Sequence, residues 1–400
     1  MRYITKIIPC LLAMLILLGC ATQETPNATT QPTMTDITLD NAFVLVIDKK
    51  APDTAQQAAQ CIQTYIDSKM KIGKPKIVNE DPGSKAIIFT LDETYSAGQY
   101  TFVTKNTSLN ITASDAHTLL YAAKQLRFAM VEGGNSTTIT AEMCEKLCGT
   151  VDVSNMPFTF VGQNILFKDI EGGNTVAERA PRYQKLIQEY QPDILALQEN
   201  SADWNYYNKS FFSKTYFAVD DTSCTVLLRK DRYEVVKKGN FWLSPTPNIK
   251  SQFEGDSGPR FSMWVVIKDL LTGQEFMISN SHLDWNNDTQ RALQLEVLIE
   301  QNAERFEQYP TIVCGDYNSQ PSGPIYARIT EFFADAAKTA DKNISTIDYT
   351  CHSFGTSQSF IDYILYSEEF HVNLYYIMND MYSGDVSDHY GVMAEMQFVK

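Results

Sequence analysis

The run Thr311-Ile312-Val313-Cys314-Gly315-Asp316-Tyr317-Asn318 places polar groups at the end of an apolar segment. The apolar and β-branched residues at its start favour a buried strand. Asp316 and Asn318 are two residues apart, so an extended chain directs both side chains to the same side. A carboxylate at the end of a buried strand needs a cation or hydrogen-bond donors around it. The run therefore predicts a chemical site at the edge of a sheet.

The same arrangement recurs through the second half of the chain. Other polar groups stand at the ends of strand-like runs in Asn164, Gln198-Glu199, Asn280-Ser281-His282-Leu283, Ile361-Asp362-Tyr363 and Ser387-Asp388-His389. A single carboxylate of this kind is most simply a helix cap or a salt-bridge partner. Six such positions in one domain are too many to explain as polar groups that happen to find hydrogen-bond partners in a core. We therefore expect them to form one site.

The composition limits the partners of such a site. The chain has 400 residues, 44% of them hydrophobic, and a formal net charge of −15. A net negative charge disfavours non-specific binding to nucleic-acid phosphates, because such binding depends on Lys and Arg. A divalent cation can still reverse the local sign and admit a phosphate ester. The sequence has no C-x-x-C pair and no Cys/His cluster, which argues against a zinc site.

The first half of the chain has a different character. Strand-like and helical patterns alternate from residue 41 to residue 132, without a cluster of titratable groups. We predict an N-terminal α/β non-catalytic domain over 39–140, a linker over 141–156 and the catalytic domain over 157–400. A packing or spacer role for the first domain is an open alternative.

The chain begins with a segment typical of exported proteins. Arg2 and Lys6 precede an apolar stretch that ends in Leu17-Leu18-Gly19-Cys20. These features predict a signal peptide over 1–19, lipidation of Cys20 and a flexible tether over 20–38. We therefore expect an extracytoplasmic lipoprotein, anchored to a membrane on the bacterial cell surface. Plain secretion without a lipid is the alternative.

The ordered motifs resemble those of the endonuclease/exonuclease/phosphatase superfamily, which has the fold of pancreatic deoxyribonuclease. The resemblance covers Phe158 to Lys400 and implies a four-layer α/β/β/α sandwich there, in addition to the smaller N-terminal α/β domain predicted above. Tyr317 replaces a common phenylalanine, and Gly391 stands where proline often follows the last motif. His282, in place of a tyrosine, argues against the abasic-site endonucleases. Residues 41–132 weakly resemble the non-catalytic N-terminal domain of α-glucuronidases and β-hexosaminidases, which implies a saccharide context.

The resemblance implies a metal-dependent attack of water on a phosphate ester. We expect Glu199, Asn164 and Asp388 to hold one Mg²⁺, a hard ion that prefers oxygen ligands, with Mn²⁺ as an alternative. Asp316 would orient and deprotonate the water, and Asn318 would fix the water or a phosphate oxygen.

The histidines complete the expected machinery. His389 would act as base or charge stabiliser, with Asp362 holding its other ring nitrogen. His282 would contact a phosphate oxygen or protonate the leaving group. Whether Asp316 or His389 is the base stays open, because coupled groups titrate as a unit.

Two further residues are candidates for substrate binding. The planar fork of Arg260 suits a phosphate, although a structural role is an equal alternative. His352 is predicted to line the pocket.

These expectations lead to a phosphoesterase that acts on a small sugar-linked or lipid-linked phosphate. One rival is a secreted surface nuclease that cleaves DNA or RNA; it requires a basic groove that the motifs do not supply. Another is a surface binding protein with an inactive catalytic fold, against which the complete set of reacting residues argues. The motifs do not distinguish a monomer from an oligomer.

Overall fold

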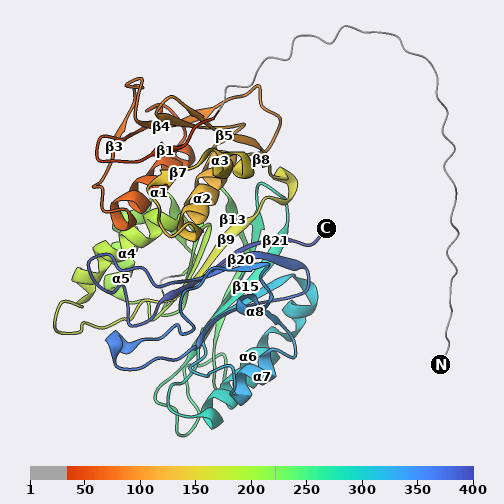
Figure 1. Ribbon diagram of the computed structural model, residues 1–400. Helices are drawn as coiled ribbons and strands as arrows, with labels where there is room; N and C mark the ends of the chain where they lie inside the picture. The colour runs from red at the N-terminus through yellow and green to blue at the C-terminus, as the bar shows by residue number, and fades with distance from the viewer. Residues whose placement is uncertain (1–33, 221) are drawn as a thin grey trace, which may run out of the picture. The chain divides into compact units, whose positions relative to one another are not determined.

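Two β-sheets from the second half of the chain pack face to face (Figure 1). The structure is a computed structural model that describes residues 34–220 and 222–400. The first sheet has the order β11 (Tyr216–Ala218), β12 (Thr225–Arg229), β10 (Ile194–Gln198), β9 (Phe158–Asn164), β21 (Gly391–Phe398), β20 (Phe370–Met378) and β18 (Lys342–Asn343). The second has the order β13 (Tyr233–Trp242), β14 (Phe261–Asp269), β15 (Glu275–His282), β16 (Thr311–Asp316), β19 (Asp362–Tyr366) and β17 (Ala334–Asp335).

The alternation of side chains along each strand divides the interior into separate cores. Phe160 and Ile194 lie in the core between the two sheets, whereas Val161 and Leu195 lie in the core beneath the helices of the first sheet. Neighbouring residues of a strand point to opposite faces of the sheet. A strand that is buried on both faces therefore has a continuous run of apolar residues in its sequence. The predicted α/β fold class is confirmed in this mixed, sheet-rich form.

Helices cover the outer faces of both sheets. Figure 1 shows α4 (Val176–Tyr190) and α5 (Ala202–Phe212) on one side, and α6 (Asp288–Gln308) and α7 (Pro324–Ile329) on the other. The short elements are η1 (Val153–Asn155), α8 (Ala336–Thr339) and η2 (Ser353–Gly355). Helix α4 begins with a capping box, in which Thr175 and Glu178 satisfy free backbone groups of the first turn.

The first half of the described chain builds a third sheet with its own helices. Its order is β3 (Lys76–Val78), β2 (Val44–Val46), β4 (Ala86–Leu91), β6 (Ser108–Ala113), β5 (Gln99–Lys105) and β8 (Gly149–Thr150). Its helices are α1 (Asp53–Lys69), α2 (Ala116–Glu132) and α3 (Ala141–Leu147), and a two-stranded sheet pairs β1 (Ile37–Thr38) with β7 (Thr138–Ile139). The domain boundaries stay a prediction, and contacts join Met34–Lys400 into one compact unit.

Buried ion pairs connect α2 to the rest of the chain. Arg127 pairs with Glu189 at the end of α4, with 2.7 Å between the charged atoms. Lys124 lies 3.0 Å from Asp193, which also accepts a hydrogen bond from the backbone nitrogen of Thr159. All four charged side chains are buried, so each depends on its partner for compensation.

The predicted signal peptide, Cys20 and most of the predicted tether lie outside the described residues. Within the described part of the chain, no helix is long and apolar enough to cross a membrane. The six cysteines there are all free.

Asp193 provides a test of the connection between the two halves. Burial disfavours its charged form, but Lys124, Arg232 and Arg229 outweigh that effect and hold its pKa below the usual value. Asp193→Asn should lower the free energy of unfolding at pH 7 by about 3–5 kcal/mol, because it leaves buried cations uncompensated. The wild-type contribution is complete above about pH 4 and is lost as the pH falls toward the native pKa. The variant should therefore show a weaker pH dependence of stability in that acid range.

Urea unfolding between pH 7 and pH 3 measures both effects. Glu142→Gln is the control, since Glu142 lies in an exposed pair with Lys146 and should leave the stability unchanged. Asp193→Asn protein as stable as wild type at pH 7 would contradict the buried network.

Candidate active site

Strand pairing brings the predicted site residues to one edge of the two sheets. In the first sheet, β9 and β10 are parallel, which pairs Asn164 with Gln198 and puts Glu199 at the next position. In the second sheet, β15 and β16 are parallel, which pairs His282 with Asp316. The ends of parallel strands share one edge, so groups far apart in the sequence become neighbours.

Antiparallel neighbours add the remaining groups. Strand β19 runs opposite to β16, so its first residue, Asp362, pairs with Asp316 at the last position of β16. Strand β21 runs opposite to β9, and the segment before it carries Asp388 and His389 to the end of β9.

Asp316 is the point at which these groups meet. Its side chain is about 2% exposed, and its Oδ2 atom accepts a hydrogen bond of 3.1 Å from Nδ2 of Asn164. Nε2 of His282 lies 3.5 Å from the same oxygen, and Nε2 of His389 lies 3.9 Å from it. The other oxygen accepts from the backbone nitrogen of Asn318. Burial raises the pKa of Asp316, which suits a carboxylate that takes up a proton during a reaction.

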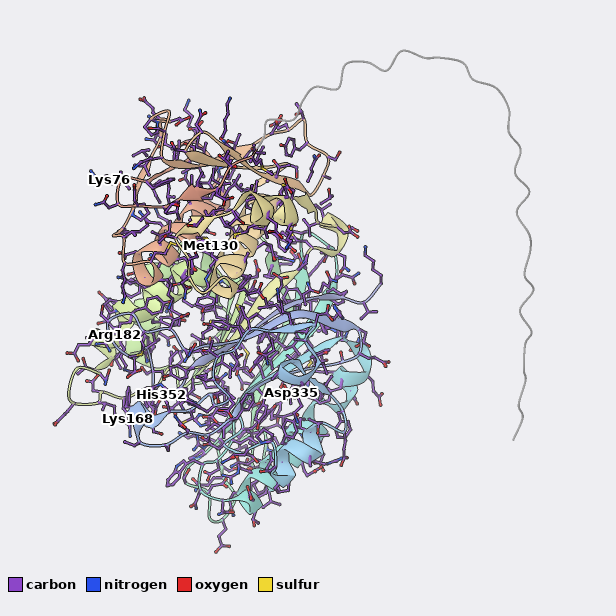
Figure 2. The ribbon with its side chains drawn as sticks, viewed as in Figure 1. Lys76, Met130, Lys168, Arg182, Asp335 and His352 are labelled. Carbon is purple, nitrogen blue, oxygen red and sulfur yellow. The ribbon has the colours of Figure 1, made fainter. Side chains whose placement is uncertain are left out.

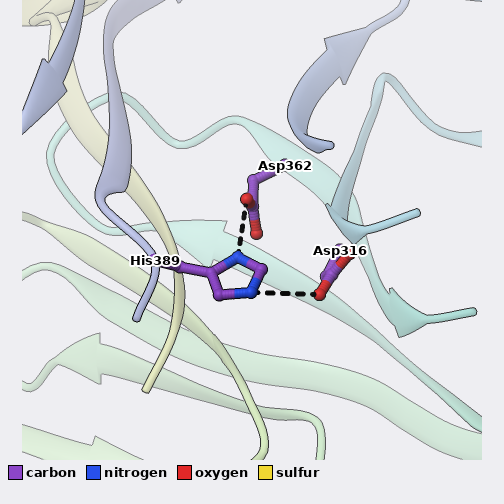
Figure 3. Close-up of side chains that lie close together, drawn as sticks. All are labelled: Asp316, Asp362 and His389. Atoms are coloured by element: carbon purple, nitrogen blue, oxygen red, sulfur yellow. Dashed lines mark hydrogen bonds and ion pairs between the residues drawn. The ribbon is translucent and has the colours of Figure 1, made fainter. Parts of the chain in front are cut away.

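His389 lies between two carboxylates (Figure 3). Its Nδ1 is 2.9 Å from Oδ2 of Asp362, while Nε2 is directed toward Asp316. Burial opposes the charged form of the imidazole, but the Asp362 carboxylate outweighs burial and raises the pKa of His389 well above its usual value. Asp362 therefore fixes the ring so that its far nitrogen is presented to the site.

His282 differs electrostatically from His389. Burial lowers the pKa of His282 to about 4, so this imidazole is neutral at pH 7. Nδ2 of Asn318 lies 3.2 Å from Nε2 of His282 and donates to the carbonyl oxygen of Leu283. Asn318 thus connects the ends of β15 and β16.

Asn164 and the backbone around it orient Glu199. Nδ2 of Asn164 donates to Glu199 at 3.1 Å as well as to Asp316, and its Oδ1 accepts from the backbone nitrogen of Leu166. In this orientation Asn164 holds the two carboxylates together and directs no oxygen toward them. Leu166, Glu199 and Asn318 have positive φ values of 54°, 56° and 50°. Such conformations are uncommon without glycine and cluster at functional sites.

A cavity of about 560 Å³ opens over these groups. Its lining includes Glu199, His282, Asp316, Asn318, Asp388, His389 and Arg260. Arg260 lies 3.6 Å from the buried carboxylate of Asp284 and donates to Ser257. Its guanidinium is therefore held by neighbouring side chains and also lines the cavity.

His352 does not line this cavity, contrary to the prediction. The ring is buried and stacks on Tyr390, with 4.2 Å between the ring centres. Its backbone nitrogen donates to the carbonyl oxygen of Asp388 at 2.9 Å. His352 thus supports the segment that carries Asp388 instead of facing a substrate.

Sequence reasoning missed several residues at the site. Thr350 donates to Oδ2 of Asp362 at 2.6 Å and accepts from the backbone of Ile361 and Asp362. A lone threonine carries no pattern that would single it out. Lys168, labelled in Figure 2 with His352, also lines the cavity, as does Trp285. Trp285 follows His282 by three residues, a proximity that could have drawn attention to it.

The donor atoms at this edge fit a hard divalent cation. Asp316, Asp362 and His389 offer ligand atoms that lie within 4.8 Å of one another. Oδ1 of Asp362 is buried without a hydrogen-bond partner in the described part of the chain. Glu199 and Asp388 add carboxylates to the same cavity. Such an oxygen-rich set is compatible with Mg²⁺ or Mn²⁺.

Comparison with known sequences agrees with this geometry. The sequence model of the Endonuclease/Exonuclease/phosphatase family matches residues 164–389, more than half of the chain. The chain belongs to this family. The match begins at Asn164 and ends at His389, so it includes every strand-end motif described above. Members of the family are phosphoester hydrolases. A separate comparison with curated proteins found no match to the chain.

Solved structures of the family share the fold. A family protein from Bacteroides thetaiotaomicron is 24% identical with a TM-score of 0.57, covering 62% of this chain and 99% of its own. One from Bacteroides vulgatus is 24% identical with a TM-score of 0.56, covering 61% and 100%. A mannosyl-6-phosphatase from Bacteroides thetaiotaomicron is 25% identical with a TM-score of 0.55, covering 60% and 99%.

The His389 arrangement gives a direct test of the site. His389→Ala should lower kcat for a phosphoester by about 10²–10⁴-fold, the usual contribution of a positioned proton-transfer group. Asp362→Asn, which leaves the ring less well oriented, should lower kcat by about 10–100-fold. Steady-state kinetics with an aryl phosphate measure both.

His371→Ala is the matched control, because His371 pairs with Asp341 at the surface, outside the cavity lining. It should retain wild-type turnover. Unchanged turnover in folded His389→Ala protein, checked by circular dichroism, would exclude His389 from catalysis.

Proposed function

We propose that this phosphoester hydrolase is a metal-dependent, extracytoplasmic lipoprotein that acts on a small sugar-linked or lipid-linked phosphate. The observation that carries the proposal is the convergence of Asn164, His282 and His389 on one buried oxygen of Asp316, at the floor of a cavity. A buried carboxylate with a raised pKa and two adjacent imidazoles is suited to moving protons at a reacting phosphoryl group.

The residues around Asp316 divide the chemistry. Asp316 would orient and deprotonate the attacking water, with Asn318 holding the water or a phosphate oxygen. His389, kept in place by Asp362, would stabilise charge on the phosphoryl group through Nε2. Neutral His282 would contact a phosphate oxygen or serve the leaving group. Arg260 would bind the phosphate through its planar fork.

Glu199 and Asp388 would hold the cation, with Asn164 orienting Glu199, while Asp316, Asp362 and His389 would keep the roles given above. The cation would supply Lewis-acid neutralisation of charge on the phosphoryl oxygens. The negative net charge of the chain makes such a local positive charge useful for binding an anionic substrate.

Three features support a small sugar phosphate as the substrate. The cavity volume of about 560 Å³ lies in the usual range for small-molecule sites. Among the described residues that line it, the lysine and arginine side chains are Lys168 and Arg260, fewer than a nuclease needs along a polyanion. One structural relative is a mannosyl-6-phosphatase.

The proposed layout follows the sequence analysis. The catalytic part over 157–400 would be a four-layer sandwich, preceded by a non-catalytic α/β domain. The lipid on Cys20 would tether both at a bacterial membrane, where a phosphorylated saccharide or lipid is within reach.

The reaction and its cation can be tested together. Purified protein with Mg²⁺ should release phosphate from mannose 6-phosphate, because a hard cation is needed to offset the charge of the phosphoryl oxygens. EDTA should abolish the release, and added Mg²⁺ or Mn²⁺ should restore it. A phosphate-release assay measures hydrolysis of the sugar phosphate, and gel electrophoresis measures cleavage of plasmid DNA as a parallel substrate. Activity that survives exhaustive chelation would remove the cation from the proposal, and preferential cleavage of DNA would favour a nuclease.

The anchor has a separate test. In a bacterial host, the wild-type protein should incorporate labelled palmitate and fractionate with membranes, since several acyl chains hold a protein stably at a bilayer. Cys20→Ser should incorporate no label and should not be retained by membranes. Cys10→Ser, which alters the signal segment only, is the control and should behave as wild type. Equal labelling of the Cys20→Ser protein would contradict lipidation at this residue.

A further inference from the structure

Two exposed aromatic side chains line the cavity that contains Asp316. Trp285 is 65% exposed and Phe167 is 54% exposed. The other three tryptophans of the chain, at 204, 242 and 264, are buried or half-buried. Leaving a large aromatic surface in water is unfavourable, so aromatic exposure inside a cavity indicates a surface that a ligand covers.

The position of Trp285 is set by its neighbours in the chain. Asp284 is buried, and it accepts hydrogen bonds from the backbone nitrogens of Ser257 and Asn286 at 2.8 Å and 2.7 Å. The backbone nitrogen of Asp284 donates to Gln294 at 2.8 Å. The backbone on both sides of the indole is thus held. In the described part of the chain no ring or cation packs on the indole, which leaves its face available.

Phe167 is connected directly to the proposed cation-binding carboxylate. Its backbone nitrogen donates to Oε2 of Glu199 at 3.2 Å. Trp285 lies three residues after His282, which is the last residue of β15 in the second sheet. Both rings are therefore positioned by segments that also position reacting groups, and a molecule that contacts the rings lies beside the phosphoryl site.

The rest of the lining indicates what such a molecule carries. Arg260 and Lys168 supply positive charge for a phosphate, and Ser201 and Ser223 supply hydroxyl groups. Serine hydroxyls rotate and can donate or accept, which matches the hydroxyls of a sugar. A pyranose ring has an apolar C–H face that packs on an aromatic ring and a rim of hydroxyls. A hexose phosphate thus matches the charged, aromatic and hydroxyl parts of one cavity.

We propose that Trp285 and Phe167 form a platform that binds the sugar ring of a hexose monophosphate and makes the enzyme selective for it. This inference rests on the proposed function, which it deepens by naming the part of the substrate that the rings contact. The platform positions the phosphate of the same molecule at Asp316 and Arg260.

The experiment compares two phosphomonoesters, one with a sugar ring and one without. Kinetics with mannose 6-phosphate and glycerol 3-phosphate give the ratio of their kcat/KM values, which measures recognition of the ring. Trp285→Ala and Phe167→Ala should each lower this ratio by about tenfold, mainly through KM for mannose 6-phosphate, as expected for the loss of one aromatic contact. Trp285→Phe should restore part of the ratio. Tyr206→Ala is the matched control, because Tyr206 is 66% exposed on α5 and outside the cavity lining.

The possible results separate this inference from the proposed function. An unchanged ratio in Trp285→Ala, with wild-type turnover of both esters, would overturn the platform and leave the phosphoesterase intact. A variant that loses adenosine 5′-monophosphate turnover more than hexose phosphate turnover would reassign the platform to a nucleobase and overturn it as a sugar site.

Binding decides the matter if the wild-type protein turns over neither ester. Calorimetry would then follow mannose 6-phosphate binding to wild-type, His389→Ala and Trp285→Ala proteins. Binding that Trp285→Ala alone loses would support the platform while the proposed reaction fails. An absence of binding to the wild-type protein would overturn both.

Discussion

The buried carboxylate of Asp316 constrains the whole catalytic half of this protein. A charge with almost no exposure is stable only if donors surround it. The groups around it come from different elements. Asn164, which ends β9 of the first sheet, donates to it, and Nε2 of His282, which ends β15 of the second, lies 3.5 Å from the same oxygen. His389, from the segment before β21, adds the third nitrogen. The site can form only when both sheets are aligned at this edge.

Buried amides below the site hold that alignment. Nε2 of Gln198 donates to Oδ1 of Asn280 at 2.7 Å across the two sheets. Asn280 in turn donates to the carbonyl oxygens of Leu197 and Thr225, at 2.9 Å and 3.0 Å. A slip of one strand would leave these buried groups unpaired, which is costly in a dry interior. The polar bridge therefore supports the register on which the Asp316 cluster depends.

Close backbone approach is the second requirement of the site. Gly315 has a φ of 143°, and a Cβ atom there would lie 1.9 Å from the carbonyl oxygen of Ser281. Only glycine lets β15 and β16 come together at the position just before His282 and Asp316.

At the opposite ends of β9 and β10, Lys124 of the first half binds Asp193 and thereby stabilises the strands that deliver Asn164 and Glu199. The first half of the chain thus contacts the strands that carry the site residues.

The amino-acid pattern alone was sufficient to predict the α/β class. It also predicted these of the residues that line the cavity: Glu199, Arg260, His282, Asp316, Asn318, Asp388 and His389. Polar residues at the ends of apolar runs have a local signature, because strand burial and chain direction can be read from neighbours. Thr350 and Phe167 have no such signature, and Trp285 is marked only by its closeness to His282 in the sequence. The roles of these residues depend on the groups that contact them or share the cavity with them. The position of His352 outside the cavity lining also depends on a contact, because its ring stacks on Tyr390. The orientation of the Asn164 amide likewise follows from its contacts with Leu166, Glu199 and Asp316. Contacts between distant segments arise only when the sheets pack, so they belong to the three-dimensional structure and not to any stretch of the chain.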